Sequence, residues 1–321
     1  VDPESPASAV PTWFTGRKRA LLAAFGVGTI DQAELAVLNA RHYMLRLFGL
    51  AGKVVIIDEV HAYDTYMSTI IDHALWWLAL LGSPVILLSA TLPTERHRQL
   101  ADAYERGLAA TPLSDSRNTE QSTLSYPALA LYIANRHKIY APTASRPHQH
   151  LRMKFTPDLP AAEEATRLLQ LVEAGGAICR LANTVRRAQD IFRALRAISP
   201  ADVELHLIHA RIPSDDRLAR ESIIADRLGK TTPRHIHDKI IVVGTQVLEQ
   251  SLDYDVDGMI TDLAPVDLLP QRAGRMHRHA RCDRGRFSEP VLDVVVGPID
   301  NGLPDLGAST HVYEPFILWK S

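Results

Sequence analysis

The sequence predicts an α/β protein with two lobes, each built around a parallel β-sheet. Short apolar runs rich in β-branched residues, such as residues 54–57, are typical of strands buried on both faces. Such runs alternate with segments of helical length along most of the chain, which indicates parallel strands joined by crossover helices. The length of 321 residues corresponds to about two domains at roughly 150 residues per domain.

The first lobe is predicted within residues 1–112. A lead-in rich in Pro, Ser and Ala covers residues 1–12, and a helix at 31–48 then opens with the capping pair Asp31 and Glu34. Two buried strands and two further helices alternate after it. The strands are expected at 54–57 and 84–88, and the helices at 64–81 and 94–108.

Residues 113–160 separate the two lobes. Ser, Thr, Pro and His are scattered there with weak periodicity, and only residues 128–133 are typical of a strand. We therefore interpret this stretch as an interdomain connection.

The second lobe is predicted over residues 161–297, where strands and helices alternate again. Its helices are expected at 161–173, 184–198, 214–228 and 269–278. Its strands are expected at 177–182, 203–208, 240–243, 259–261 and 291–296. We interpret residues 298–321, which contain Gly, Pro, Phe316 and Trp319, as a linker towards a further domain.

The composition is that of a globular protein, with 46% hydrophobic and 22% charged residues. The net charge of −2 excludes a generally basic nucleic-acid coat but allows a local basic groove. Cys179 and Cys282 have no CxxC partner, which argues against a zinc site and favours a reducing, cytoplasmic location. The most apolar stretch, residues 74–88, is broken by Gly-Ser-Pro and is too short to span a bilayer, so no membrane partner is expected.

Two groups of polar side chains follow the predicted strands of the first lobe. Asp58 and Glu59 follow the first strand, at the edge where open α/β sheets bind ligands. One carboxylate there can hold Mg²⁺ and the next can orient a water molecule for attack on a phosphate. A solvated acidic turn is the alternative, but the preceding strand and His61 favour the site. Ser89 and Thr91 follow the second strand and could couple a nucleotide site to a neighbouring surface, but Ser and Thr at strand ends are commonly plain caps.

A third group of residues lies in the second lobe. The triplet Gly-Thr-Gln at 244–246 follows a buried strand, and Arg275 and Arg278 lie three residues apart in the helix predicted at 269–278. Two guanidinium groups on one helical face suit the charge that develops on a transferring phosphoryl group. A solvated basic helix is the alternative. The nearby Arg281, Arg284 and Arg286 could follow DNA phosphates or lie in a solvated loop.

These segments resemble motifs II, III and VI of the superfamily 2 helicases. The matching residues are 58–61 (DEVH), 89–91 (SAT) and 271–278 (QRAGRMHR). A finer similarity, to the CRISPR-associated helicase–nuclease of type I systems, rests on residues 28–32 (GTIDQ), 247–253 (VLEQSLD) and 262–279. The resemblance runs from residue 13 to residue 319 and implies two RecA-like lobes, the first of them incomplete.

The resemblance implies a role for each matching residue of the first lobe. Asp58 would bind Mg²⁺ through water, and Glu59 would activate the water that hydrolyses ATP. His61, Ser89 and Thr91 would link the nucleotide site to the DNA path. Single-stranded DNA would also contact Gly28 and Thr29.

Further roles are implied in the second lobe. Thr245 would touch a DNA phosphate, and Asp253 would lie near the ribose or the lobe interface. Gln271, Arg275 and Arg278 would form the motif VI set, with both arginines acting on the γ-phosphate. The implied partners are single-stranded DNA and a crRNA-guided surveillance complex that delivers an R-loop.

The sequence also departs from the family pattern. No G-x-x-x-x-G-K-[ST] segment occurs, so the loop that cradles phosphates is missing. We also expect the HD nuclease domain, with its transition metal, and the C-terminal domain to lie outside this chain, so residues 1–112 would be the back half of the first lobe. The chain alone is then expected to be inactive as an ATPase. Another superfamily 2 translocase or RNA helicase, or a non-catalytic docking module, remain the alternatives.

Overall fold

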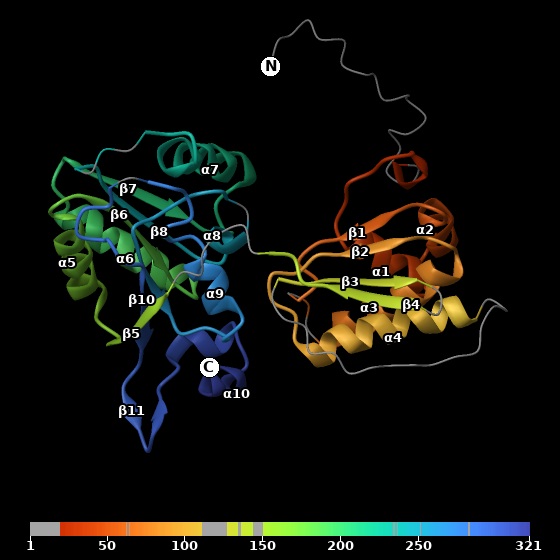
Figure 1. Ribbon diagram of the computed structural model, residues 1–321. Coiled ribbons are helices and arrows are strands. Elements are labelled where there is room, and N and C mark those ends of the chain that lie inside the picture. The colour runs from red at the N-terminus through yellow and green to blue at the C-terminus, as the bar shows by residue number, and fades with distance from the viewer. Residues whose placement is uncertain are drawn as a thin grey trace, which may run out of the picture. The chain divides into compact units, whose positions relative to one another are not determined.

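The computed structural model describes residues 20–61, 63, 65–110, 127–133, 136–143, 150–233, 235, 237–250, 252–281 and 283–321. The chain divides into two compact units, residues 1–147 and 148–321, and Figure 1 shows the elements of each. Both units contain a parallel sheet with helices packed against it, which confirms the predicted α/β class. The domain limits drawn from the sequence stay a prediction.

In the first unit, the described residues form a parallel sheet of two strands. Strands β1 (Val55–Ile57) and β2 (Val85–Leu87) pair in register, and helix α3 (Thr65–Leu80) connects them. Helix α4 (Thr94–Ala109) packs closely on α3, since a Cβ atom on Gly107 would lie only 2.3 Å from the carbonyl oxygen of Trp76. The buried core consists of Ile57, Val60, Ile71, Leu75, Leu100 and Ala103.

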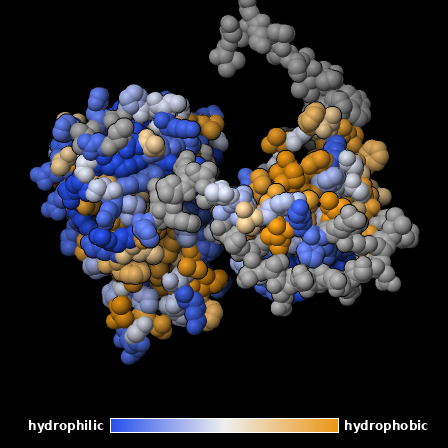
Figure 2. Space-filling model, viewed as in Figure 1, coloured by the Kyte–Doolittle hydropathy of each residue, from blue (hydrophilic) through white to orange (hydrophobic). Residues whose placement is uncertain are grey.

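One face of this small sheet is apolar and exposed. The side chains of Val54, Ile56, Ile86 and Leu88 are between 46% and 61% exposed, and Figure 2 shows hydrophobic residues gathered over β1 and β2. Parallel strands are normally buried on both faces. The exposed apolar face is unusual for a parallel sheet, and the incompleteness of the first lobe stays a prediction.

The single helix predicted at 31–48 is wrong. The structure has two short helices, α1 (Asp31–Val37) and α2 (Tyr43–Leu50), which pack against each other. Leu38 has an extended backbone with ψ 152°, and His42 is left-handed with φ 68°, so the helical hydrogen bonds cannot continue between them. The apolar periodicity persists on both sides of this break, which is why the pattern alone predicted one helix. A 3₁₀ turn at Ala20–Leu22 precedes them.

A β-hairpin follows α4 in the described part of the first unit. Strand β3 (Leu129–Ile133) matches the strand predicted near 128–133, and its antiparallel partner β4 (Arg136–Tyr140) was not expected. The Tyr132 hydroxyl lies 3.0 Å from Nε2 of His97 and so ties the hairpin to α4.

The second unit is built on a parallel sheet of six strands in the order β5-β10-β9-β6-β8-β7. The strands are β5 (Arg152–Pro157), β6 (Gly176–Leu181), β7 (Val203–Ile208), β8 (Lys239–Gly244), β9 (Gly258–Asp262) and β10 (Val291–Val296). Five of them match the predicted strands to within one or two residues. The edge strand β5 was missed because all but one of its side chains are exposed and its sequence, RMKFTP, carries no apolar run.

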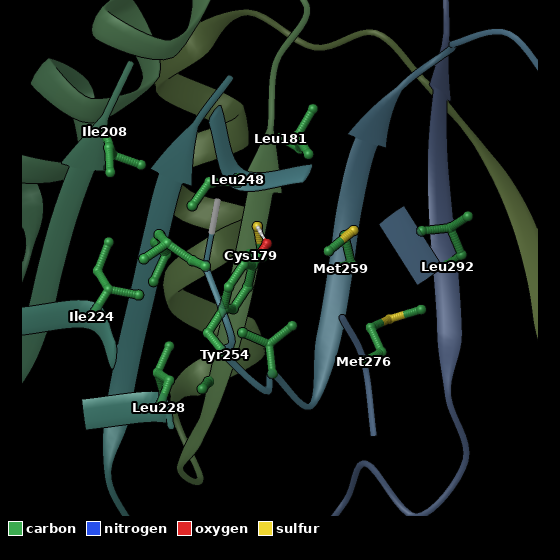
Figure 3. Close-up of a cluster of buried hydrophobic side chains, with 14 of the residues drawn as sticks. Cys179, Leu181, Ile208, Ile224, Leu228, Leu248, Tyr254, Met259, Met276 and Leu292 are labelled. Carbon is green, nitrogen blue, oxygen red and sulfur yellow. Dashed lines mark hydrogen bonds between the residues drawn. The ribbon is translucent and has the colours of Figure 1, made fainter. Parts of the chain in front are cut away.

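Helices cover both faces of this sheet. They are α5 (Ala161–Val172), α6 (Val185–Ile198), α7 (Ser214–Leu228), α8 (Val247–Gln250) and α9 (Leu268–Ala273). One buried cluster joins α5 and α6 to the sheet, and the other joins α7, α8 and α9 to the opposite face. Figure 3 shows the second cluster, in which the buried Cys179 lies beside Tyr254. Burial raises the pKa of the Cys179 thiol to about 12.

The residues predicted as a linker form a small folded segment. It contains the hairpin β11 (Ile299–Asp300) and β12 (Leu303–Pro304), a 3₁₀ turn at Gly307–His311, and helix α10 (Pro315–Lys320). Tyr313 packs against the core and Leu318 is only 1% exposed. Residues 297–321 therefore belong to the packed second unit, and their role as a linker stays a prediction.

Candidate functional site

Asp58 and Glu59 lie directly after β1, at the carboxyl edge of the first unit's sheet. Both residues are exposed, and the backbone N–H of Glu59 donates a hydrogen bond of 2.9 Å to Oδ1 of Asp58. Glu59 has φ 53°, a left-handed conformation that few residues other than glycine adopt. Such strain costs on the order of 1–3 kcal/mol and is concentrated at functional sites. The turn therefore presents two carboxylates to solvent in a fixed and costly geometry.

His61 connects this turn to the segment after β2. Its Nδ1 atom lies 2.8 Å from Oγ of Ser89 and 3.4 Å from a carboxylate oxygen of Glu59, and its side chain is 3% exposed. The Ser89 hydroxyl donates to the carbonyl oxygen of Thr91, so the imidazole is the donor in the His61–Ser89 bond. The structure thus brings together four residues that the sequence singled out.

Backbone pairing explains why these residues meet. The N–H of Leu88 donates to the oxygen of Ile57, and the N–H of Val60 donates to the oxygen of Leu88, so the chains stay paired beyond the strands. The carboxyl ends of neighbouring parallel strands share one edge of a sheet. Segments 28 residues apart therefore place their polar side chains at hydrogen-bonding distance.

The carboxylates fit a Mg²⁺ ion that is held mainly by water and phosphate. Mg²⁺ is typically bound by one or two carboxylates together with waters and substrate phosphates. Asp58 offers an exposed carboxylate oxygen, and within the described residues no cluster of three or more metal-ligating side chains is found. The exposed Asp58 carboxylate therefore fits such an ion, and its binding of Mg²⁺ through water stays a prediction.

Gly28 and Thr29 lie on an exposed loop before α1. The Thr29 hydroxyl donates a 2.8 Å hydrogen bond to Asp31, which fixes the loop to the start of the helix. The loop belongs to the same unit as Asp58. Its contact with DNA stays a prediction.

In the second unit, Thr245 and Asp253 follow β8. Thr245 is 2% exposed, and its N–H donates to the carbonyl oxygen of Ile208 at the end of β7. Asp253 is exposed and accepts a 2.7 Å hydrogen bond from Nε of Arg278. Burial opposes the charge on Asp253, but the hydrogen bond and charge of Arg278 outweigh it and lower the pKa of this carboxyl.

The prediction that Arg275 and Arg278 share a helical face is wrong. Helix α9 contains Pro270 and ends at Ala273, so both arginines lie in the loop that follows. This loop lies along residues 252–257, with a bridge between Val256 and Met276. Arg275 donates to the carbonyl oxygens of Leu252 and Glu249, and its guanidinium lies 5.8 Å from the centre of the Tyr254 ring.

Gln271 remains in α9, where its amide approaches the carbonyl oxygen of Asp267 at 3.4 Å. The structure therefore places the predicted motif VI residues on two different kinds of backbone. Gln271 is helical, whereas Arg275 and Arg278 are held by the segment after β8.

Two of the neighbouring arginines, Arg281 and Arg284, do not lie in a solvated loop, whereas Arg286 is exposed and its contact with DNA phosphates stays a prediction. Arg281 and Arg284 form ion pairs with Asp255 and Asp257, whose side chains are no more than 1% exposed. These buried pairs connect the loop to the amino ends of the sheet. The signal in the sequence was the alternation YDVD at 254–257, where carboxylates inside a buried run demand partners.

Sequence reasoning missed Arg272. This residue is fully buried and forms an ion pair of 2.7 Å with Glu249, which is also buried. Burial raises the pKa of Glu249, while the charge and hydrogen bond of Arg272 act in the opposite direction. Glu249 belongs to the VLEQSLD segment and Arg272 to the QRAGR segment. Nothing in the sequence pattern indicates that these two side chains pair.

Comparisons with known proteins show similarity to one group of nuclease/helicases. The family model of the CRISPR-associated nuclease/helicase Cas3, C-terminal, matches residues 174–281. A CRISPR-associated endonuclease/helicase Cas3 of Thermus thermophilus is 35% identical over 99% of this chain and 37% of its own length. A CRISPR-associated nuclease/helicase Cas3 of Streptococcus thermophilus is 37% identical over 100% of this chain and 34% of its own length.

Solved structures give the same result. The crystal structure of T. fusca Cas3 has a TM-score of 0.87 and 38% identity over 99% of this chain and 38% of that chain. T. fusca Cas3 with ADP has a TM-score of 0.83 and 38% identity over 95% of this chain and 37% of that chain. A structure described as the CRISPR RNA-guided surveillance complex, pre-nicking, has a TM-score of 0.81 and 38% identity, covering 94% of this chain and 38% of that chain.

The chain spans between 34% and 38% of the length of these relatives. The similarity extends over both units, since it covers between 94% and 100% of this chain. Over nearly its whole length, the chain is therefore similar to a helicase fragment of the CRISPR-associated nuclease/helicase Cas3.

Proposed function

We propose that this chain forms the motor portion of an ATP-dependent helicase that translocates on single-stranded DNA during CRISPR interference. The observation that carries the proposal is the contact of His61 with Ser89 and Glu59 at the carboxyl edge of β1 and β2. This contact connects the candidate water-activating carboxylate to the following strand. Nucleotide hydrolysis could therefore move the segment after β2.

In this proposal, the first unit supplies the chemistry of hydrolysis. Asp58 holds Mg²⁺ through water, and Glu59 accepts a proton from the attacking water. Mg²⁺ would supply charge neutralisation on the phosphate oxygens. The conformational change that follows hydrolysis is transmitted through His61, Ser89 and Thr91. It reaches the DNA contacts at Gly28 and Thr29.

The second unit supplies contacts to phosphate groups. Thr245 binds a DNA phosphate. Asp253 and Gln271 fix the part of the unit that faces the nucleotide. Arg275 and Arg278 stabilise the charge that develops on the γ-phosphate, because a guanidinium can bind phosphate oxygens in a bidentate manner. Support for this assignment comes from the exposure of the Arg278–Asp253 pair, which leaves Arg278 accessible to a ligand.

The proposed substrate is the displaced DNA strand of an R-loop that a crRNA-guided surveillance complex delivers, with the protein in the cytoplasm. The likeness to a relative in a pre-nicking surveillance complex supports this partner. Degradation of the strand would need a separate HD nuclease domain with its transition metal. No helix of the described residues is long and apolar enough to cross a bilayer.

The test is ATP hydrolysis by the native protein that contains this chain. We expect single-stranded DNA to stimulate turnover strongly, and RNA of the same sequence to have little effect. A surveillance complex that carries an R-loop should recruit the protein, and one without target DNA should not. Stimulation by RNA alone would support the RNA helicase alternative and contradict the proposal.

One observation favours a docking module as the second candidate. The 321 residues contain no phosphate-binding loop of the G-x-x-x-x-G-K-[ST] type. If the native protein also lacks this loop, it should bind the surveillance complex without any DNA-stimulated ATP hydrolysis. The same assays therefore decide between the two candidates.

A further inference from the structure

Arg272 lies at the centre of a buried hydrogen-bond network in the second unit. A guanidinium has five N–H donors, and burial makes each unsatisfied donor costly. The side chain of Arg272 has no exposed surface, and five acceptors surround it. They are the Glu249 carboxylate, the Thr261 hydroxyl, the Asp262 carbonyl oxygen, the Asn183 side-chain oxygen and the Tyr313 hydroxyl.

Two of the residues around this network come from the segment that the sequence predicted to be a linker. The Tyr313 hydroxyl accepts from Arg272 at 3.1 Å and from the amide of Gln246 at 3.4 Å. The Ser309 hydroxyl accepts from the amide of Asn183 at 2.9 Å. The C-terminal segment is therefore hydrogen-bonded to the loops at the carboxyl ends of the strands.

The network is connected to the candidate phosphate-binding residues Thr245 and Arg275 through one neighbouring residue each. Gln246 is the neighbour of Thr245 and donates to the carbonyl oxygen of Asn183 at 3.0 Å. Glu249, which Arg272 holds through its carboxylate, accepts from Arg275 through its carbonyl oxygen. One tyrosine hydroxyl thus supports the backbone that carries Thr245 and the backbone that holds Arg275.

We infer that Tyr313 is a positioning residue, which fixes residues 245–250 and the Arg275 loop through Arg272 and Gln246. The inference rests on the proposed function for its effect on turnover. Without the hydroxyl, one N–H of the buried Arg272 and one of Gln246 lose an acceptor in a place that water reaches poorly. The guanidinium then has to shift, and Glu249 and Arg275 shift with it.

The first arm of the test uses hydrogen exchange on this chain. Tyr313→Phe keeps the ring and removes only the hydroxyl. We expect backbone amide exchange in residues 245–250 and 272–278 to rise by about tenfold, since the lost bond involves a charged donor. Ser309→Ala is a second variant, which should act on residues 181–183 and 245–246.

Tyr254→Phe is the matched control. Tyr254 is fully buried in the same unit, and its hydroxyl contacts only the Cys179 thiol, at 3.8 Å, among the hydrogen bonds of the described residues. The control should change exchange in these two segments by less than about twofold. Equal exchange in Tyr313→Phe and Tyr254→Phe would overturn the inference, because any lost hydroxyl would then have the same effect.

The second arm measures ATP hydrolysis stimulated by single-stranded DNA in the native protein. We expect Tyr313→Phe to lower kcat by about tenfold while KM for ATP changes by less than about twofold, a split that mere loss of folded protein would not produce. An unchanged kcat would overturn the inference. If the unaltered native protein shows no such turnover, the proposed function fails, and the exchange arm alone decides the positioning role.

Discussion

At the scale of single residues, charged side chains in this chain divide into those exposed for chemistry and those buried for structure. Asp58 and Glu59 are exposed beside a strained turn, whereas Arg272 and Glu249 are buried and paired with each other. Arg275 and Arg278 share a proposed role at phosphate but differ in their contacts, since Arg275 is half-buried and Arg278 is exposed. Arg275 holds two backbone carbonyls, and Arg278 forms an exposed pair with Asp253.

The exposed carboxylate of Glu59 leads to the first prediction. In the native protein, Glu59→Gln should abolish ATP hydrolysis while nucleotide binding persists, because an amide keeps the shape but cannot accept a proton from water. Steady-state hydrolysis and equilibrium ATP binding measure the two effects. Retained turnover would contradict the role of Glu59 as the base.

The two arginines lead to the second prediction. Arg275→Lys and Arg278→Lys should each lower DNA-stimulated hydrolysis in the native protein by about 10³ to 10⁵, the range for arginine fingers. Lysine offers a point charge in place of a planar fork.

Thermal unfolding of this chain separates the two arginines. Arg275→Lys removes hydrogen bonds to Glu249 and Leu252 and should lower Tm of the second unit by about 2–4 °C. Arg278→Lys changes an exposed pair and should leave Tm within about 1 °C. Unaltered hydrolysis in both variants would contradict the proposed role of these arginines at the γ-phosphate.

At the scale of elements, the close packing of α4 on α3 forms much of the core of the first unit. Gly107 lets α4 approach the carbonyl of Trp76, and no residue with a Cβ atom can occupy that position without a shift of backbone. The paired helices bury Ile71, Leu75, Leu100 and Ala103 and so support strand β1, which directly precedes Asp58.

The third prediction tests this contact. Gly107→Ala places a Cβ atom 2.3 Å from a backbone oxygen and should destabilise the first unit by about 1–3 kcal/mol. Gly26→Ala is the control, because no atom lies within 4 Å of its Cβ position. Chemical denaturation followed by circular dichroism measures both variants. Equal stability of the two would show that α3 and α4 do not approach this closely.

At the scale of the whole molecule, the two units differ in how completely they bury their sheets. The second unit has six parallel strands with a buried cluster on each face. The first unit has two described parallel strands with an exposed apolar face. We therefore expect the second unit to be the more stable one.

The fourth prediction concerns nucleotide binding by this chain. ATP should not bind with submicromolar affinity, even with Mg²⁺ and single-stranded DNA, because most phosphate contacts in such sites come from a glycine-rich loop and its lysine. Isothermal titration with ATP and a non-hydrolysable analogue measures this. Tight binding would mean that other residues hold the phosphates.

The sequence alone determined the class of fold and the place of the candidate site. Alternation of buried strands and helices depends on local periodicity, so β7, α7 and β10 match their predicted limits residue for residue. The position of Asp58 and Ser89 followed from the same pattern, because polar residues after buried strands meet at one edge of a parallel sheet.

Only the tertiary structure decided which charged residues stabilise the fold. The break between α1 and α2, the edge strand β5 and the loop that holds Arg275 all depend on contacts with segments far away in sequence. The apolar periodicity of a segment gives no information on such contacts. Arg272 and Tyr313 are 41 residues apart, and their hydrogen bond exists because burial leaves each polar group no water to bind.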